Sequence, residues 1–178
     1  MITKYKIIYA DPPWNYADQG CQGTMANHYQ GMKIEDICSL KVSEIADENS
    51  ILFLWTTYPF LKEAQQVIQS WGFNYKTIAF QWLKLNPKSL TPFYGLGRWT
   101  RGNTEPCLLA TRGKIKRVSN SVFQLIQEPR SRHSAKPKIV RDKIVELMGD
   151  LPRIELFARD VGGGWHAWGN EVKSDIEL

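Results

Sequence analysis

The sequence predicts an α/β protein whose mostly parallel sheet carries helices on both faces. The first observation is a short β-branched and aromatic run at 5–10 that stops at Asp11-Pro12-Pro13. The second is a continuous apolar run at 51–55, which is typical of a parallel strand covered on both faces. The third is the alternation of such runs with helical stripes of apolar residues. With 178 residues, we expect a single domain over 1–178.

After the first two strands, apolar residues recur on one helical face from 60 to 71. Pro59 near the start of this stripe and Gly72 just after it are the usual punctuation of a helix. A further strand is expected from about 76 to 83.

The second half of the chain begins with a long loop at 86–103, rich in proline and glycine. Loops of this length inside compact domains are often functional. A strand is expected at 106–110, a helix at 139–148, and a last strand at 154–157. Because ligands of such sheets bind beyond the carboxyl ends of the strands, the candidate sites are 11–14 and 157–159.

Composition excludes several classes of protein. Hydrophobic residues make up 43% and charged residues 23% of the chain, which are globular values. No apolar run approaches the roughly 20 residues of a membrane span, and the N-terminus lacks the pattern of a signal peptide, so we expect a cytoplasmic protein. Three separated cysteines without CxxC spacing predict reduced thiols and no metal site.

The charge is concentrated in one segment. Residues 98–143 hold 12 basic and three acidic residues, a net of +9 within a chain of net +5. Such asymmetry favours a polyanionic partner whose phosphates are neutralised by lysine and arginine. A solvated basic face is the alternative, and charge alone does not decide between them.

The motif Asp11-Pro12-Pro13-Trp14 directly follows a predicted strand. Two prolines fix φ and remove two backbone donors, which leaves a stiff loop with outward carbonyls. Asp11 adds a carboxylate acceptor and Trp14 an aromatic face. A flat heterocycle with an exocyclic amine would suit this set, although a rigid turn with a tryptophan over the core is the alternative.

An ordered set of motifs along nearly the whole chain resembles the MT-A (MT-A-seventy) family of adenine-N6 methyltransferases. This is the family of the catalytic subunit of the mRNA adenosine-N6 methyltransferase complex, and it has bacterial and phage members. After DPPW the matching stretches are 29–32, 53–56, 81–84, 97–99 with 103–105, 130–137, 154–159 and 168–171.

The resemblance implies a Rossmann-like methyltransferase fold with a permuted motif order, in which the catalytic motif precedes the cofactor motif. It also implies S-adenosylmethionine as methyl donor and the N6 amine of adenine in nucleic acid, DNA before RNA, as acceptor. The target base would leave a duplex or arrive single-stranded.

Site residues are carried over from matching positions. The implied catalytic residues are Asp11, Pro12, Pro13 and Trp14. The implied cofactor-binding residues are Asp11, Lys136, Phe157, Ala158, Arg159, Asn170 and Glu171. Lys136 matches a lysine at the methionine end of the cofactor, and its place before a helix favours an anionic partner.

Substrate contacts are expected from two kinds of residue. Trp14, Tyr29 and Trp82 are stacking candidates, and for Tyr29 and Trp82 the alternative is burial in a packed region. Arg98, Lys114 and Lys116 are phosphate-binding candidates. With no separate target-recognition domain, selectivity would depend on the loops at about 15–30, 86–103 and 127–136 or on a second subunit, in a homodimer or with another chain.

The sequence also allows a function other than DNA methylation. A catalytically weak, nucleic-acid-binding subunit of a methyltransferase complex is the alternative from another class, as is methylation of RNA. The intact motif, together with Lys136 and Asn170, favours the enzyme.

Overall fold

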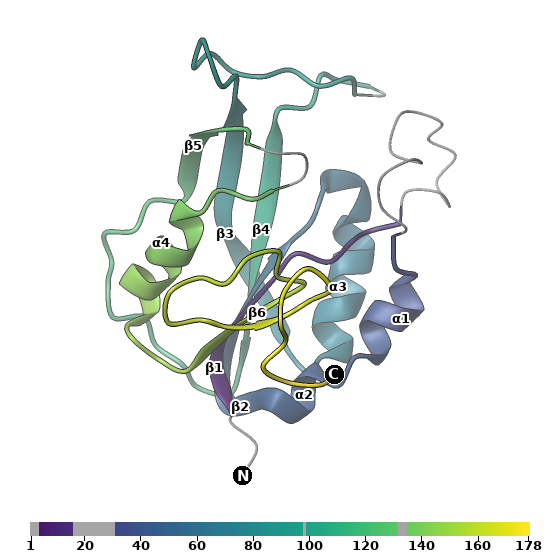
Figure 1. Cartoon of the computed structure of the whole chain (residues 1–178), viewed down its shortest axis with the longest axis vertical. Coiled ribbons are helices and arrows are strands. Elements are labelled where there is room, and N and C mark those ends of the chain that lie inside the picture. Colours follow the sequence, from purple (N-terminus) through teal and green to yellow (C-terminus); the bar gives the residue numbers. More distant parts are fainter. Residues whose placement is uncertain (1–3, 16–30, 98, 132–134) are drawn as a thin grey trace.

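The architecture is a seven-stranded sheet between helices. The structure, a computed structural model, describes residues 4–15, 31–97, 99–131 and 135–178. Within them the sheet order is β5-β3-β4-β2-β1-β6-β7 (Figure 1). In chain order the elements are β1 (Tyr5–Ala10), α1 (Ile34–Ser39), α2 (Val42–Ile45), β2 (Ala46–Trp55), η2 (Tyr58–Phe60), α3 (Leu61–Ser70), β3 (Asn74–Leu85), β4 (Thr104–Arg112), β5 (Leu125–Pro129), α4 (Ile139–Met148), β6 (Arg153–Leu156) and β7 (His166–Trp168).

One strand runs against the others. β1 pairs in parallel with β2 and β6, β6 with β7, and β3 with β5. β4 is antiparallel to both of its neighbours, β2 and β3. The carboxyl ends of six strands and the start of β4 therefore meet at one edge of the sheet, and the prediction of a mostly parallel α/β fold is confirmed.

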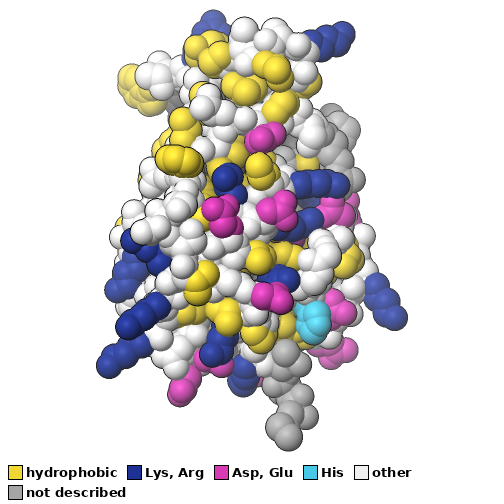
Figure 2. Space-filling model, turned by 90° about the vertical axis from the view of Figure 1, so that its left-hand side faces the viewer, with side chains coloured by type: hydrophobic (Ala, Val, Ile, Leu, Met, Phe, Trp, Pro, Cys, Tyr) yellow, Lys and Arg dark blue, Asp and Glu magenta, His cyan; other side chains and the backbone are white. Residues whose placement is uncertain are grey.

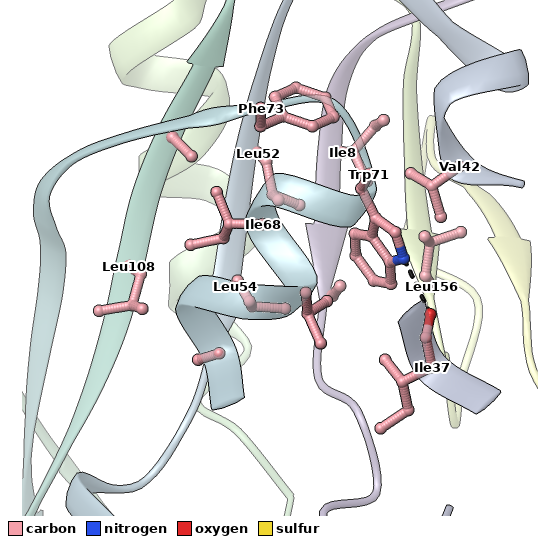
Figure 3. Packing of buried hydrophobic residues seen from close by; sticks show 14 of the residues in the cluster. Ile8, Ile37, Val42, Leu52, Leu54, Ile68, Trp71, Phe73, Leu108 and Leu156 are labelled. Atoms are coloured by element: carbon pink, nitrogen blue, oxygen red, sulfur yellow. Dashed lines mark hydrogen bonds between the residues drawn. The ribbon is translucent and has the colours of Figure 1, made fainter. Parts of the chain in front are cut away.

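The first face of the sheet is covered by α1 and α3. Alternate strand residues such as Ile8 and Leu52 pack there against Ile68 and Trp71. Trp71 Nε1 donates a hydrogen bond of 2.9 Å to the Ile37 carbonyl, which joins the end of α3 to α1 (Figure 3). Both helices are thereby fixed against this face.

The second face is covered by α4. Tyr9 and Trp55, which alternate with residues of the first face, pack there in one cluster with Val140, Ile144 and Met148. Burial on both faces explains the continuous apolar run of β2. It also places the segment before α4 beside the carboxyl ends of β1 and β2.

Within the described residues the predicted elements are present, together with the short turn η2 and four further elements. The predicted helices correspond to α3 and α4, and the strand expected at 76–83 is the longer β3. The short elements α1, α2, β5 and β7 were not predicted. β5 is a five-residue edge strand with only Ile126 buried, so it lacks the apolar run of a central strand.

Two further observations concern the described part of the chain. No helix there is long and apolar enough to cross a membrane. No group of three or more histidine, cysteine, aspartate or glutamate side chains there is arranged to hold a metal ion.

Candidate active site at the carboxyl edge of the sheet

The predicted motif residues lie where the topology gathers strand ends. Asp11 follows β1, and its backbone N–H faces the carbonyl of Leu156, the last residue of β6. Glu105 lies at the start of β4, beside Trp82 of β3 in the antiparallel register. Side chains from distant parts of the sequence therefore meet beyond one edge of the sheet.

Four charged side chains lie in a row at the centre of this site, in the order Asp11, Lys136, Glu105 and Lys84. Lys136 Nζ lies 2.9 Å from each carboxylate oxygen of Asp11. The same ammonium lies 3.4 Å from Glu105 Oε2, and Lys84 Nζ lies 2.5 Å from Glu105 Oε1. The side chains of Lys136 and Asp11 are only 13% and 20% exposed. Positive and negative side chains alternate along this row, so each buried charge has a neighbour of opposite sign.

Burial and neighbouring charges set the pKa values of the side chains in this row. Burial raises the pKa of Asp11, and the attraction of Lys136 opposes this rise without cancelling it. Burial also acts to raise the pKa of Glu105, but Lys136 and Lys84 together outweigh it and lower that pKa. For Lys136, two carboxylates outweigh the cost of burial and raise its pKa. Lys136 is therefore firmly charged, while Asp11 is the more easily protonated carboxylate.

The proline loop is held by its own carbonyls. The Pro12 carbonyl accepts a 2.9 Å hydrogen bond from the Trp14 backbone N–H, and the Pro13 carbonyl accepts one of 2.9 Å from Met32. Each carbonyl oxygen keeps a second lone pair. The carbonyls of this loop, predicted to face outward, thus already have backbone partners.

The two described stacking candidates are packed. Trp14 is 8% exposed, stacks on Phe60 at a centroid distance of 5.8 Å, and donates from Nε1 to the Trp55 carbonyl. Trp82 is 4% exposed and lies edge-on to Trp55 at 6.5 Å. Both rings are therefore packed into the interior, and neither offers an open face.

A cavity of about 570 Å³ adjoins Asp11 and Lys136. Its lining includes Tyr9, Asp11, Glu128, Pro129, Ser131, Ala135, Lys136, Pro137, Lys138, Arg141, Glu155, Phe157, Arg159 and Asp160. Four predicted site residues are thereby brought together: Asp11, Lys136, Phe157 and Arg159. This cavity is large enough for a small organic molecule.

The other predicted cofactor residues lie beside the cavity rather than in its wall. Ala158 is buried, and its N–H donates to the Trp168 carbonyl. Arg159 pairs with Glu171 at 3.5 Å, and Glu171 and Asn170 are exposed. Phe157 has a left-handed φ of 60°, which is unusual for a residue with a side chain. The chain thus makes a strained turn where it leaves β6 for the cavity.

A second cluster of charged side chains lies in the cavity wall and was not predicted from the sequence. Arg141, from the first turn of α4, lies 2.5 Å from Glu155 of β6 and 2.5 Å from Asp160. Lys138 adds a contact of 3.5 Å to Asp160. Burial raises the pKa of Glu155 despite its hydrogen bond from Arg141, and that arginine lowers the pKa of Asp160. The only signal in the sequence was a glutamate inside the apolar run 154–157.

Other predicted residues lie elsewhere. Lys114 follows β4 at its far end, where its N–H donates to Asn49, and Lys116 is exposed nearby along the chain. Counting along β2 from Asn49 to Trp55, this end is about 20 Å from the carboxyl edge. The structure therefore does not bring these lysines to Asp11. Tyr29 and Arg98 lie outside the described residues.

Known proteins resemble this chain over most of its length. The family model described as MT-A70 matches residues 5–171. A type II methyltransferase, M.MunI of Mycoplasma sp, is 37% identical over 98% of this chain and 81% of its own. The N(6)-adenosine-methyltransferase catalytic subunit METTL3 of Homo sapiens is 25% identical over 97% of this chain and 29% of its own.

A third relative has a different role in its name. The N6-adenosine-methyltransferase non-catalytic subunit MTB of Arabidopsis thaliana is 30% identical over 66% of this chain and 15% of its own. The chain thus spans about four fifths of the bacterial relative and less than a third of these plant and human relatives.

Proposed function

The chain belongs to the MT-A70 family of methyltransferases, and on this premise we propose that it transfers a methyl group from S-adenosylmethionine to the N6 amine of adenine in DNA. The observation that carries the proposal is the buried carboxylate of Asp11, held at the carboxyl end of β1 beside a cavity with charges of both signs. The similarity to a type II methyltransferase supports DNA as the substrate.

Asp11 has the chemistry that an adenine amine requires. The amine lone pair is conjugated with the ring, so it is a weak nucleophile until the nitrogen becomes tetrahedral. An ionised Asp11, assisted by the Pro12 carbonyl, would accept the amine N–H groups and favour that geometry. Such contacts are stronger in the transition state than in the ground state, which is what raises a rate. The proton then leaves to water, without a covalent enzyme intermediate.

The cavity suits the proposed cofactor. When bound, S-adenosylmethionine supplies a methyl group on a sulfonium centre. Its amino-acid end carries one carboxylate and one ammonium, and the cavity wall offers Lys136, Lys138 and Arg159 to the first and Glu155 and Asp160 to the second. Phe157 and Ala158 would border the cofactor, while Asn170 and Glu171 are proposed to hydrogen-bond its ribose.

Lys136 would then serve three anionic groups. Its ammonium already neutralises Asp11 and Glu105, and a cofactor carboxylate in the adjoining cavity would be another anion within its reach. In this role Glu105 holds Lys136 in place, and Lys84 in turn holds Glu105. Both are positioning residues, because neither contacts Asp11.

Two groups of residues are proposed to contact nucleic acid, one near Asp11 and one at the opposite end of the sheet. Tyr29, Trp82 and Arg98 would act near the base, and Trp82 would need to become less buried to stack on it. Lys114 and Lys116, at the far end of the sheet, would meet phosphates further along a duplex. A second subunit, identical or different, remains compatible with this arrangement, and the similarity to a non-catalytic subunit keeps the supporting role as the second candidate.

Labelled-methyl transfer tests the proposal. Wild type and Asp11→Ala are each incubated with labelled S-adenosylmethionine and adenine-containing DNA or RNA oligonucleotides, and binding of the oligonucleotides is measured in parallel. We expect labelled DNA from wild type only, with DNA binding retained by the variant. Equally little product from both proteins, with binding intact, would support the non-catalytic subunit instead. Preferential labelling of RNA would change the substrate.

A further inference from the structure

An exposed apolar tip projects from the loop between β3 and β4. Within segment 93–102, Leu96 and Trp99 are 96% and 95% exposed, and Tyr94 is 57% exposed. All seven tryptophans fall within the described residues, and the other six are buried or half-buried. Because burying a tryptophan is strongly favourable, full exposure of Trp99 indicates a surface that binds something.

The stem of this tip is ordered by backbone hydrogen bonds. Gly95 N–H donates to the Gly102 carbonyl at 2.7 Å, and Lys84 N–H donates to the Asn103 carbonyl at 2.9 Å. Phe93 N–H donates back to the Lys84 carbonyl at 2.8 Å. The β3–β4 ladder thus continues beyond the sheet as a narrow ribbon, which presents Trp99 from a built support.

The tip lies close to the proposed site along the chain. Trp99 is six residues from Glu105, so the two Cα atoms are at most about 20 Å apart. Figure 1 shows the loop beyond the ends of β3 and β4, at the same edge of the sheet as the end of β1. A strand of nucleic acid with a base at Asp11 would therefore pass within reach of the tip.

The charge around the tip favours a polyanion. Residues 85–104 contain three basic residues and no acidic one. Of these, Lys88 and Arg101 are exposed. Figure 2 shows hydrophobic side chains gathered at this end of the molecule, with Lys or Arg side chains at their border. An aromatic ring bordered by cations is the pattern that binds unpaired bases and their phosphates.

We propose that Trp99 stacks on a base next to the target adenine and that Arg101 and Lys88 contact the flanking phosphates. The inference rests on the proposed function and adds to it the element that holds the strand while the adenine is displaced. An inserted or stacked ring compensates for the stacking that a displaced base loses. It also assigns part of substrate selection to the loop at 86–103.

The test compares Trp99→Ala with Trp99→Phe and with Phe123→Ala, a control that removes another exposed aromatic ring, just before β5. The probe is a duplex oligonucleotide that wild type methylates, with 2-aminopurine beside the target adenine. We measure its dissociation constant, its fluorescence on binding, and the oligomeric state by sedimentation. Trp99→Ala should weaken binding by roughly 10-fold or more and change the fluorescence response, whereas Phe123→Ala should change neither.

Further outcomes decide the proposal. Restoration of binding by Trp99→Phe supports stacking, and a smaller salt dependence in Arg101→Ala supports the phosphate contact. Binding by Trp99→Ala within twofold of wild type overturns the inference while leaving the proposed function intact. Loss of binding that accompanies dissociation of a dimer also overturns it, because the tip is then a subunit interface. Absence of methyl transfer by wild type defeats the proposed function itself.

Discussion

The two ends of the sheet carry basic residues of different kinds. At the carboxyl end, Lys136 is nearly buried between Asp11 and Glu105, and its charge is fully engaged by neighbours. At the opposite end, Lys114 and Lys116 are exposed around a turn that is fixed to Asn49 through the backbone. The net charge of +9 over 98–143 therefore combines cations that build a site with cations that face solvent.

The consequence concerns how substitutions are expected to act. A buried cation between two carboxylates controls their pKa values and the local fold, so its loss affects chemistry and stability together. An exposed lysine affects only long-range attraction, which salt screens. Substitutions at the two ends therefore separate effects on chemistry and stability from effects on long-range attraction of nucleic acid.

The largest effect is expected at Asp11. Asp11→Asn keeps the shape of the side chain but removes the charge that would accept the amine protons, so turnover should fall by about 10² to 10³. Asp47→Asn, whose carboxylate only accepts the Asn49 N–H at the opposite end, is the matched control. Steady-state methyl transfer checks both variants, and retention of more than half the activity by Asp11→Asn would remove Asp11 from the chemistry.

Lys136→Met should reduce stability and shift the pH profile. The variant leaves Asp11 without the cation that it contacts and Glu105 with Lys84 alone. This should cost about 3 kcal/mol in the free energy of unfolding, measured by urea denaturation. Because Lys136 holds down the pKa of Asp11, the acid limb of kcat/KM should move to higher pH. Lys116→Met should change the unfolding free energy by less than about 0.5 kcal/mol. An unmoved acid limb in Lys136→Met would mean that Asp11 is not the titrating group.

Glu105→Gln should change how stability depends on pH. The pKa of Glu105 is below its usual 4.5 in the folded protein, so its charged form stabilises the fold above about pH 4.5 and that contribution is lost as the pH falls further. The variant should therefore be less stable than wild type at pH 7, with a difference that shrinks below pH 4.5. Thermal melts across pH test this, with exposed Glu35→Gln as the control. A constant difference would contradict the lowered pKa.

The smallest effect on turnover is expected from Lys114→Glu combined with Lys116→Glu. At saturating substrate kcat should be unchanged, because the pair lies about 20 Å from the carboxyl edge. If both lysines meet phosphates, as proposed, nucleic acid should bind more weakly and the salt slope should fall by roughly 2. An unchanged slope would show that these lysines form a solvated face.

Much of the fold was predictable because its signals are local. The apolar run of β2 and the stripe of α3 follow from burial on one or both faces, and each is visible within about ten residues. The position of Asp11 at a strand end was predictable for the same reason. In contrast, the edge strand β5 and the short β7 owe their structure to pairing with β3 and β6, which no local pattern reveals.

Some residues that lie at the site were predicted from the sequence, but their pairings were not. Lys136 was expected to meet an anion, yet its bond to Asp11 spans 125 positions and depends on how α4 packs against β1 and β2. Glu105 and Lys84 lay in family-like motifs without an assigned role. Their pairing arises from the antiparallel register of β3 and β4, and Arg141 with Glu155 likewise needs the packing of α4 on β6.

The proposed activity at the carboxyl end of the sheet is methylation of adenine at N6 in DNA. It can be tested by mass spectrometry of nucleosides from DNA and RNA, after expression in a host without methylation of its own. We expect N6-methyldeoxyadenosine in DNA from cells with the wild-type chain and none above background with Asp11→Ala. Absence of that nucleoside with both proteins, or a methylated cytosine in its place, would rule out adenine N6 in DNA as the acceptor.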